Sequence, residues 1–159
     1  MSHIEPTGLV VRSADAETLD DGPTSVITLL ADRGETSPVT VNRASLHVGS
    51  PGAPAHLHRE ATELFYVLDG VARILLGEVI HELRPGDFVL VPPGVAHAFA
   101  PAASHATELL VTFSGGPPRF DYYRLLERVY RGEATLADIA ASGPEFDNHY
   151  VDSPVWNSR

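Results

Sequence analysis

The sequence predicts an all-β fold, an antiparallel barrel or sandwich that is followed by one or two helices. Two observations carry this prediction. Short β-rich runs separated by Gly, Pro and Asp follow one another from residue 25 to residue 113, and helical spacing begins only after residues 115–118. Short strands joined by tight turns are typical of antiparallel barrels and sandwiches. With 159 residues, 43% of them hydrophobic, the chain can bury one core, and we expect one domain.

The eight expected strands share a high content of β-branched and aromatic residues. In chain order they are SVITLLA, PVTVNRASLHV, ELFYVLDG, VARILLG, EVIHEL, DFVLVPPG, VAHAFA and TELLVTF. Asp69-Gly70 suits the two-residue turn of a β-hairpin, and Pro85 supplies the fixed φ that a later turn needs.

Helices are expected near the C-terminal end. Apolar residues recur at helical spacing between Phe120 and Tyr130, and Gly132 offers a stop. Thr135 and Asp138 resemble a capping box at the start of a second short helix. We expect both helices to pack on the outside of the β-structure as a lid or buttress.

The chain divides into three segments of one domain. Residues 1–24 form a polar, acidic arm that is expected to be irregular or to cover a sheet edge. Residues 25–116 form the barrel, and residues 117–159 contain the helices and a tail. Because the tail is too apolar for a solvated segment, we expect it to dock on the barrel or on a partner subunit.

Composition excludes several classes of function. The net charge of −10, with only 11 Lys and Arg residues, argues against a nucleic-acid partner, since phosphate binding needs clustered cations. The chain has no Cys, so any metal site must use histidine, carboxylate and water. We find neither a signal peptide nor a membrane span. We therefore expect a cytoplasmic protein whose partners are small molecules or copies of itself.

Two histidines and a glutamate stand close together in HLHREATELFYVLDG, residues 56–70. Alternate side chains of a β-strand point to the same side, so His56 and His58 would share one side. Glu63 follows after a gap long enough to turn a corner, and a later strand of a closed barrel can bring His97 opposite. Three imidazoles and one carboxylate suit a divalent first-row metal ion, and Fe, Mn, Ni, Co, Cu and Zn are all served by them.

Two motifs in this region resemble those of the cupins. The first motif of that family contains HxH, then Glu, then Gly, and it is matched by His56, His58, Glu63 and Gly70. The second is matched by Gly86, Pro92, Gly94 and His97. The sequence departs from the family at the leading Gly of the first motif, which is Ser50 here, and at the Asn that commonly ends the second, which is Pro101.

The resemblance implies a cupin-type β-barrel, or jelly roll, in which His56, His58, Glu63 and His97 bind the metal. It also implies a homodimer joined by edge strands and the N-terminal arm. The layout of residues 97–126 is similar to that of small single-domain cupins, among them quercetinase-like dioxygenases and cyclases of aromatic polyketide pathways.

Three functions follow from this resemblance. The first is a metal-dependent dioxygenase that acts on a small phenolic or enolic molecule, with Glu63 as general base. The second is a zinc Lewis acid that cyclises or isomerises a polyketide-like substrate. The third is a metal-containing module that binds a small ligand without turnover.

Several other residues are weaker candidates for functional roles. Surface or structural roles are expected for the remaining histidines, His3, His47, His81, His105 and His149. Glu60 is expected in a solvent-facing turn. Apolar strand residues that could line a cavity, but are more typical of a core, are Phe65, Val67, Phe99 and Val111.

Two short segments could contribute to the pocket. Tyr122, Tyr123 and Arg124 could reach over the barrel mouth, although such an aromatic stripe is usually the buried side of a helix. The apolar parity of residues 39–48 changes midway, which leaves open whether Asn42, Arg43 or Ser45 faces inward. Arg43 inside would favour an anionic substrate.

Overall fold

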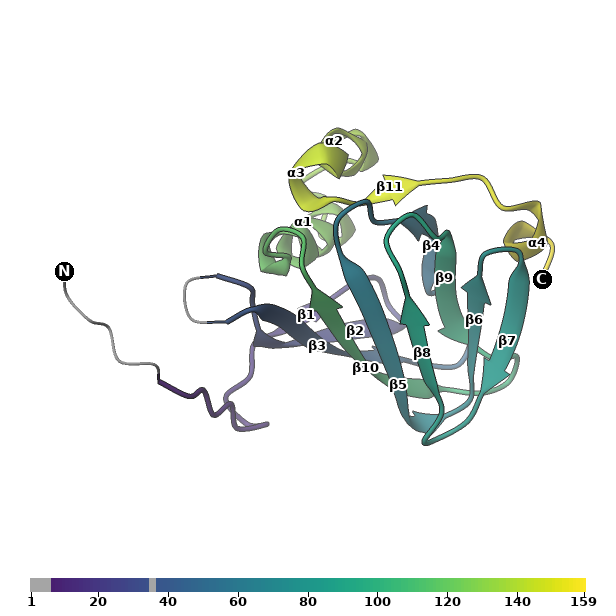
Figure 1. Cartoon of the computed structure of the whole chain (residues 1–159), viewed down its shortest axis with the longest axis horizontal. Coiled ribbons are helices and arrows are strands. Elements are labelled where there is room, and N and C mark those ends of the chain that lie inside the picture. Colours follow the sequence, from purple (N-terminus) through teal and green to yellow (C-terminus); the bar gives the residue numbers. More distant parts are fainter. Residues whose placement is uncertain (1–6, 35–36) are drawn as a thin grey trace.

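The computed structural model describes residues 7–34 and 37–159. Two sheets face each other, and the helices gather mainly at one end of the first sheet (Figure 1). The strand pairings of the described residues are all antiparallel. The expected all-β fold with C-terminal helices is confirmed.

The first sheet has six strands, in the order β1 (Thr18–Asp20), β2 (Ser25–Ala31), β3 (Val39–Leu46), β10 (Thr107–Ser114), β5 (Thr62–Gly70) and β8 (Phe88–Val91). The second has five, in the order β11 (His149–Tyr150), β4 (Ala53–Leu57), β9 (His97–Pro101), β6 (Ala72–Leu76) and β7 (Val79–Leu83). Each of the eight expected runs contains a strand, whereas β1, β4 and β11 were not among them.

The N-terminal arm pairs with the edge of the first sheet. Thr18–Asp20 forms β1 beside β2, and residues 8–11 are not part of a strand. Residues 1–6, with His3, lie outside the described residues.

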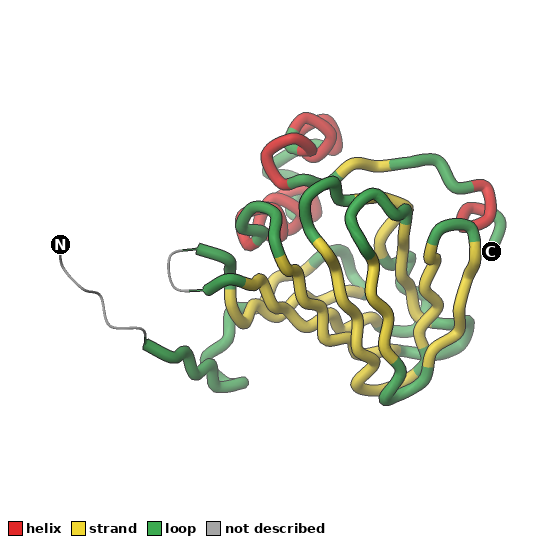
Figure 2. Tube along the Cα trace, in the orientation of Figure 1, coloured by secondary structure: helices red, strands yellow, loops and turns green. Residues whose placement is uncertain are grey.

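The helices follow β10 in the last quarter of the chain, and Figure 2 shows them in red. They are α1 (Phe120–Tyr130), α2 (Leu136–Ala141), α3 (Gly143–Phe146) and α4 (Pro154–Asn157). The capping box of α2 is confirmed, because the Thr135 side chain accepts from the Asp138 backbone N–H and the Asp138 carboxylate accepts from that of Thr135. None of the helices in the described residues is long and apolar enough to cross a membrane.

The tail docks on the barrel of its own chain. Trp156 is 2% exposed and packs on the outer face of the second sheet. The side chains beneath it are mostly small: Ala55, Leu75, Ala98 and Ala100. An indole of this size contributes on the order of 2 kcal/mol or more when it is buried. This contact fixes the far end of the tail and so the path of the residues before it.

Alternating burial along the strands defines the space between the sheets. In β5 the buried residues are Glu63, Phe65 and Val67, and in β10 they continue from Thr107 to Phe113 at every second position. Glu63 therefore occupies a core position of its strand. A carboxylate at such a position is costly unless other groups compensate its charge.

The structure shows which residues of β3 face inward. Thr40, Asn42, Ala44 and Leu46 are buried, so the parity does not change along the strand. Asn42 faces inward, whereas Arg43 is exposed and pairs with Glu108. Ser45 is half-buried and also bonds to Glu108. The polar inward position of Asn42 is what made the apolar pattern seem to switch.

The hairpin predicted at Asp69-Gly70 was wrong. β5 lies in the first sheet and β6 in the second, so the chain crosses between sheets at this point. Gly70 has φ of 73°, and a Cβ there would lie 1.9 Å from the carbonyl oxygen of Ala106. Close backbone approach, rather than a hairpin turn, therefore explains this glycine.

Candidate metal centre

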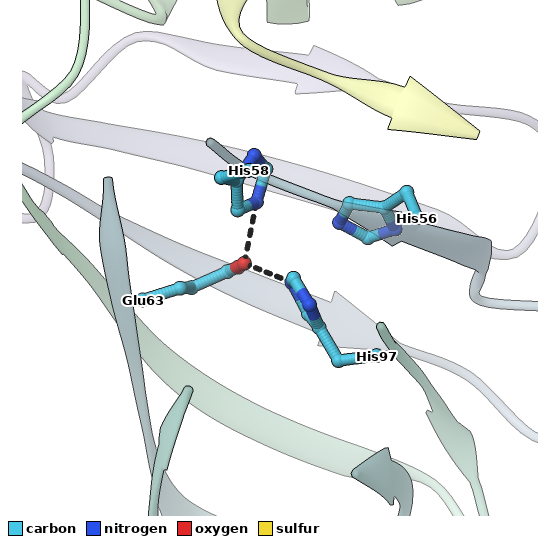
Figure 3. Close-up of side chains that lie close together, drawn as sticks. All are labelled: His56, His58, Glu63 and His97. Carbon is cyan, nitrogen blue, oxygen red and sulfur yellow. Dashed lines mark hydrogen bonds and ion pairs between the residues drawn. The ribbon is translucent and has the colours of Figure 1, made fainter. Parts of the chain in front are cut away.

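The four residues named from the motifs lie together between the two sheets (Figure 3). His56 lies in β4 and His58 directly follows it, while His97 begins β9 opposite His56. Glu63 approaches from β5 of the other sheet. One potential ligand atom from each residue lies within 4.8 Å of the other three. The cluster could therefore hold a single metal ion.

All four side chains are buried, with exposed fractions of 6% or less. Glu63 Oε2 lies 2.8 Å from His58 Nε2 and 2.5 Å from His97 Nε2, as the dashed lines of Figure 3 show. The ring centroids of His56 and His97 are 4.3 Å apart. Such a polar cluster stabilises a fold poorly unless every charge is compensated, so it indicates a functional site.

A backbone carbonyl orients each imidazole. His56 Nδ1 lies 2.7 Å from the carbonyl oxygen of Pro54, His58 Nδ1 lies 2.6 Å from that of Asp147, and His97 Nδ1 lies 3.0 Å from that of Val95. Because a carbonyl only accepts, each Nδ1 carries the proton and donates it. The Nε2 lone pair of a neutral ring is thereby left for the centre of the cluster, which is the arrangement that fixes metal-binding histidines.

This donor set fits a metal ion. In their neutral form His58 and His97 present Nε2 lone pairs to the Glu63 carboxylate, which also only accepts. Acceptors this close need a shared positive charge, supplied either by protons on the rings or by a cation between them. Three imidazole nitrogens and one carboxylate oxygen are ligands that first-row divalent ions accept.

The pKa directions match this charge pattern. Burial disfavours ionised Glu63, but His97 and the hydrogen bonds from His58 and His97 outweigh burial and hold the pKa of Glu63 well below its ordinary value. Burial lowers the pKa of His56 well below its ordinary value, and His97 adds to this effect. Burial also opposes a charged His97, yet Glu63 raises its pKa. At neutral pH the site offers a carboxylate and a neutral His56.

Asp147 holds the loop that joins His58 to Glu63. Its carboxylate accepts from the backbone N–H groups of Arg59, Glu60 and Ala61, at 2.7, 2.9 and 3.1 Å. The carbonyl of the same residue accepts from His58, as described above. Asp147 ends α3 with a left-handed backbone, φ 53°. One residue of the tail thus positions both a metal-ligand candidate and the loop behind it.

A cavity of about 560 Å³ lies beside the cluster, and His56 and Glu63 form part of its wall. Most of the wall is apolar and comes from several strands and α1, including Ile27, Leu46, Phe99, Val111, Phe113 and Leu126. The polar contributions include Asn42, Arg119, Asn148 and Tyr150. An organic molecule held here would contact the metal-ligand candidates at one end and apolar side chains along its length.

The candidate cavity residues divide between wall and core. Phe99, Val111, Tyr122 and Tyr123 line the cavity, while Phe65 and Val67 are wholly buried in the core. Arg124 is exposed on α1 and forms ion pairs with Glu17 and Asp121.

Among the described residues, the histidines outside the motifs do not join the cluster. His47, His81 and His105 are exposed, and so is Glu60 in the loop after His58. His149 is half-buried, 3.4 Å from Asp147 Oδ1.

Two residues of the site were missed by the sequence reasoning. Asp147 lies in a tail without periodicity, and no spacing links it to the motifs. Arg119 stands next to Phe120 at the start of α1, where it reads as a solvated charge, yet it is 2% exposed and lines the cavity. The one sequence signal that could have drawn attention to Arg119 is the turn-forming run before it, Gly115-Gly116-Pro117-Pro118.

Comparison with known proteins identifies the fold family. Residues 42–113 match the family model described as the cupin domain. An RmlC-like cupin from Shewanella frigidimarina NCIMB 400 is 25% identical, with a TM-score of 0.61, over 73% of this chain and 96% of that one. KdgF from Halomonas sp. is 20% identical, with a TM-score of 0.62, over 73% and 99%.

A third structure, of Fe(II) HppE, is 16% identical, with a TM-score of 0.59, over 67% of this chain and 60% of that chain. No curated protein matches the chain closely enough to count as a relative. The family match, the two histidine motifs and the antiparallel barrel around them agree. This chain carries a small domain of the cupin superfamily.

Proposed function

We propose that this protein is a metal-dependent dioxygenase that acts on a small phenolic or enolic molecule. The observation that carries the proposal is the convergence of three Nδ1-anchored histidines and Glu63 on one point of the wall of a largely apolar cavity. His56, His58, Glu63 and His97 would hold the ion. The naming of HppE as an Fe(II) protein adds that a barrel of this fold can carry iron.

A bound first-row ion would act as a Lewis acid toward a substrate oxygen and, if redox-active, would allow reaction with dioxygen. The chain's own residues do the rest. The apolar wall excludes water from the reacting end of the substrate. Tyr122 and Tyr123, on α1, close the cavity on the helical side, and Tyr123 is anchored by its hydroxyl to Asn42 Oδ1 at 2.9 Å.

Glu63 is the proposed general base. Its side chain lines the cavity, beside the space that a substrate would occupy. Both of its hydrogen bonds from the described residues go to Oε2. The second oxygen, Oε1, is thus the atom assigned to accept a proton from a substrate hydroxyl.

Metal analysis and oxygen uptake test the proposal. Untagged protein, produced without added metal, is expected to contain close to one equivalent of Fe, Mn, Ni or Cu by mass spectrometry. A panel of phenols, enols and organic acids should then yield substrate-dependent oxygen consumption at an electrode. Zinc together with turnover in the absence of oxygen would instead favour the cyclase or isomerase. Metal without any turnover would favour a binding module.

Metal affinity is expected to rise with pH and then level off. In the metal-free protein the pKa of His97 is raised, so below that pKa an ion must displace its proton. Apparent affinity should therefore increase by about tenfold per pH unit until His97 is neutral, and change little above that point. Competition titrations with a chromophoric chelator from pH 5.5 to 8.5 measure this curve. A flat curve would contradict the assignment of His97 as a ligand.

We also propose that two copies of the chain form a dimer through the outer face of β5 and β8. β8 is an edge strand, and large apolar side chains are exposed on this face: Tyr66, Leu68, Phe88 and Leu90, at 43–54%. The cross-strand pairs Tyr66–Phe88 and Leu64–Leu90 make the patch continuous. Burying exposed edges and apolar patches against a second copy is favourable.

Light scattering after gel filtration should report the mass of two chains for the wild type. The double substitution Tyr66→Lys and Phe88→Lys places four cations in the symmetric contact and is expected to give the mass of one chain at the same concentration. Val79→Lys, at an exposed apolar position of β7, is the control and should remain dimeric. A wild type with the mass of one chain would refute the dimer.

A further inference from the structure

Arg119 is a buried cation in the wall of the cavity that contains the candidate metal centre. It precedes α1 and is 2% exposed, and the cavity wall includes it together with His56 and Glu63. Arginine is rarely buried to this extent without an acidic partner. Packing alone therefore does not explain why this charged side chain is buried.

No acid of the described residues forms an ion pair with this guanidinium. Asp32, which could have done so, instead accepts from the backbone N–H groups of Arg119 and Phe120, at 2.8 and 3.2 Å. The guanidinium donates only to neutral oxygens, from Nη1 to the carbonyl of Phe146 at 2.7 Å and from Nη2 to Asn148 Oδ1 at 3.2 Å. No carboxylate of the described residues therefore neutralises this guanidinium at ion-pair distance.

One donor of Arg119 has no acceptor. Nε is buried and is the one side-chain nitrogen or oxygen of this kind that lacks a hydrogen-bond partner in residues 7–34 and 37–159. Leaving a buried, charged donor unsatisfied is unfavourable. A guanidinium edge that contains Nε–H is also the edge that binds a carboxylate in a fork geometry.

Aromatic rings hold the guanidinium in place beside the metal-ligand candidates. The Arg119 Cζ atom lies 4.4 Å from the ring centroid of Phe113 and 5.0 Å from that of Tyr122. The ring of Phe113 also lies beside that of His58, with 5.4 Å between the two ring centroids. Phe113 thus contacts both groups, and a single small molecule in the cavity could reach Arg119 and the metal-ligand candidates together.

We propose that Arg119 binds a carboxylate of the substrate, so that the substrate is a phenolic or enolic acid with its anionic group held away from the metal. Cation–π contacts fix the guanidinium but do not neutralise it, and a carboxylate supplies both the missing charge and the missing acceptor. For the metal-bound end of the molecule this inference rests on the proposed function. Arg119, not Arg43, is then the arginine that selects an anionic substrate.

A matched pair of ligands tests the proposal by isothermal titration calorimetry. The probes are 3,4-dihydroxybenzoate and its amide, 3,4-dihydroxybenzamide, which differ in charge at one group. The wild type is expected to bind the acid at least about tenfold more tightly, as charge-assisted hydrogen bonds to a buried group require. Equal affinities, or no binding of either probe, would overturn the proposal without any variant.

Variants then assign the preference to one side chain. Arg119→Met should remove the preference for the acid while leaving affinity for the amide within about twofold, and Arg119→Lys should keep part of it, because the charge is retained without the fork. Arg124→Met, which removes an exposed arginine of α1, should change neither affinity. A loss of both affinities in parallel would indicate a merely structural role for Arg119 and would contradict the proposal.

The same titration on chelator-treated protein separates this inference from the proposed function. If Arg119 creates the preference for the acid over the amide, that preference persists in metal-free protein. If the preference instead comes from binding of the carboxylate to the metal, it disappears when the metal is removed. If oxygen uptake is never seen but the preference persists, the substrate class stands and the dioxygenase fails. If neutral phenols are oxidised as well as their acids, the dioxygenase stands and the role of Arg119 fails.

Discussion

Replacement of His58 by alanine is expected to reduce bound metal from near one equivalent to a trace. The ring of His58 supplies one of four converging ligand atoms, and the loss of even an outer-shell partner typically costs 10- to 100-fold in metal affinity. For a direct ligand we expect a loss of at least about a hundredfold, and loss of turnover with it. Metal content by mass spectrometry and affinity by chelator competition measure the two effects.

The barrel should stay folded in this variant, because His58 contributes to the site rather than to the apolar core between the sheets. Circular dichroism with thermal melting checks this. His105→Ala is the matched control, since His105 is exposed and its Nδ1, like that of His58, bonds to a backbone carbonyl, in this case that of Ala103. Retention of one equivalent in His58→Ala, or an equal loss in His105→Ala, would refute the four-residue site. Glu63→Gln, which keeps the shape of the side chain, should behave like His58→Ala.

The cluster could be predicted from the sequence because its members are tied to strands by short spacings. His56 and His58 stand at alternate positions at the end of β4, and Glu63 follows after a single loop, so local geometry alone brings them near one another. His97 needed the second motif, whose glycines lie where the chain turns. Gly94 shows how: its N–H donates to the carbonyl oxygen of His58 at 2.7 Å, which joins the two motifs directly.

The residues that could not be predicted reach the site through tertiary contacts of the tail. Asp147 lies 89 positions after His58, and its place depends on the docking of α3, β11 and Trp156. Arg119 faces inward because the chain enters α1 beside Phe113. No periodicity or spacing encodes either contact. At Gly70, local turn propensity favoured a hairpin, but the chain crosses to the other sheet, and Gly70 instead meets the backbone of Ala106, just before the neighbouring strand β10.

Removal of the Asp147 side chain is expected to weaken both the fold and the metal site. Three backbone N–H groups, of Arg59, Glu60 and Ala61, would lose the acceptor that they share. We expect a loss of about 3 kcal/mol in the free energy of unfolding. Because these residues form the loop between His58 and Glu63, metal affinity should also fall by about 10- to 100-fold. Urea unfolding and chelator competition measure the two quantities.

The choice of substitution separates side-chain loss from backbone strain. Asp147 has φ of 53°, where alanine adds about 1 kcal/mol of strain and glycine adds none. Asp147→Gly is therefore the informative variant, and Asp147→Ala should be the less stable of the two. Asp138→Ala, which breaks the capping box of α2, should cost about 1 kcal/mol but leave metal affinity unchanged. If Asp147→Gly bound metal as tightly as the wild type, the tail would stabilise the barrel without positioning its ligands, and the site would be complete within the strands and the loop after β4.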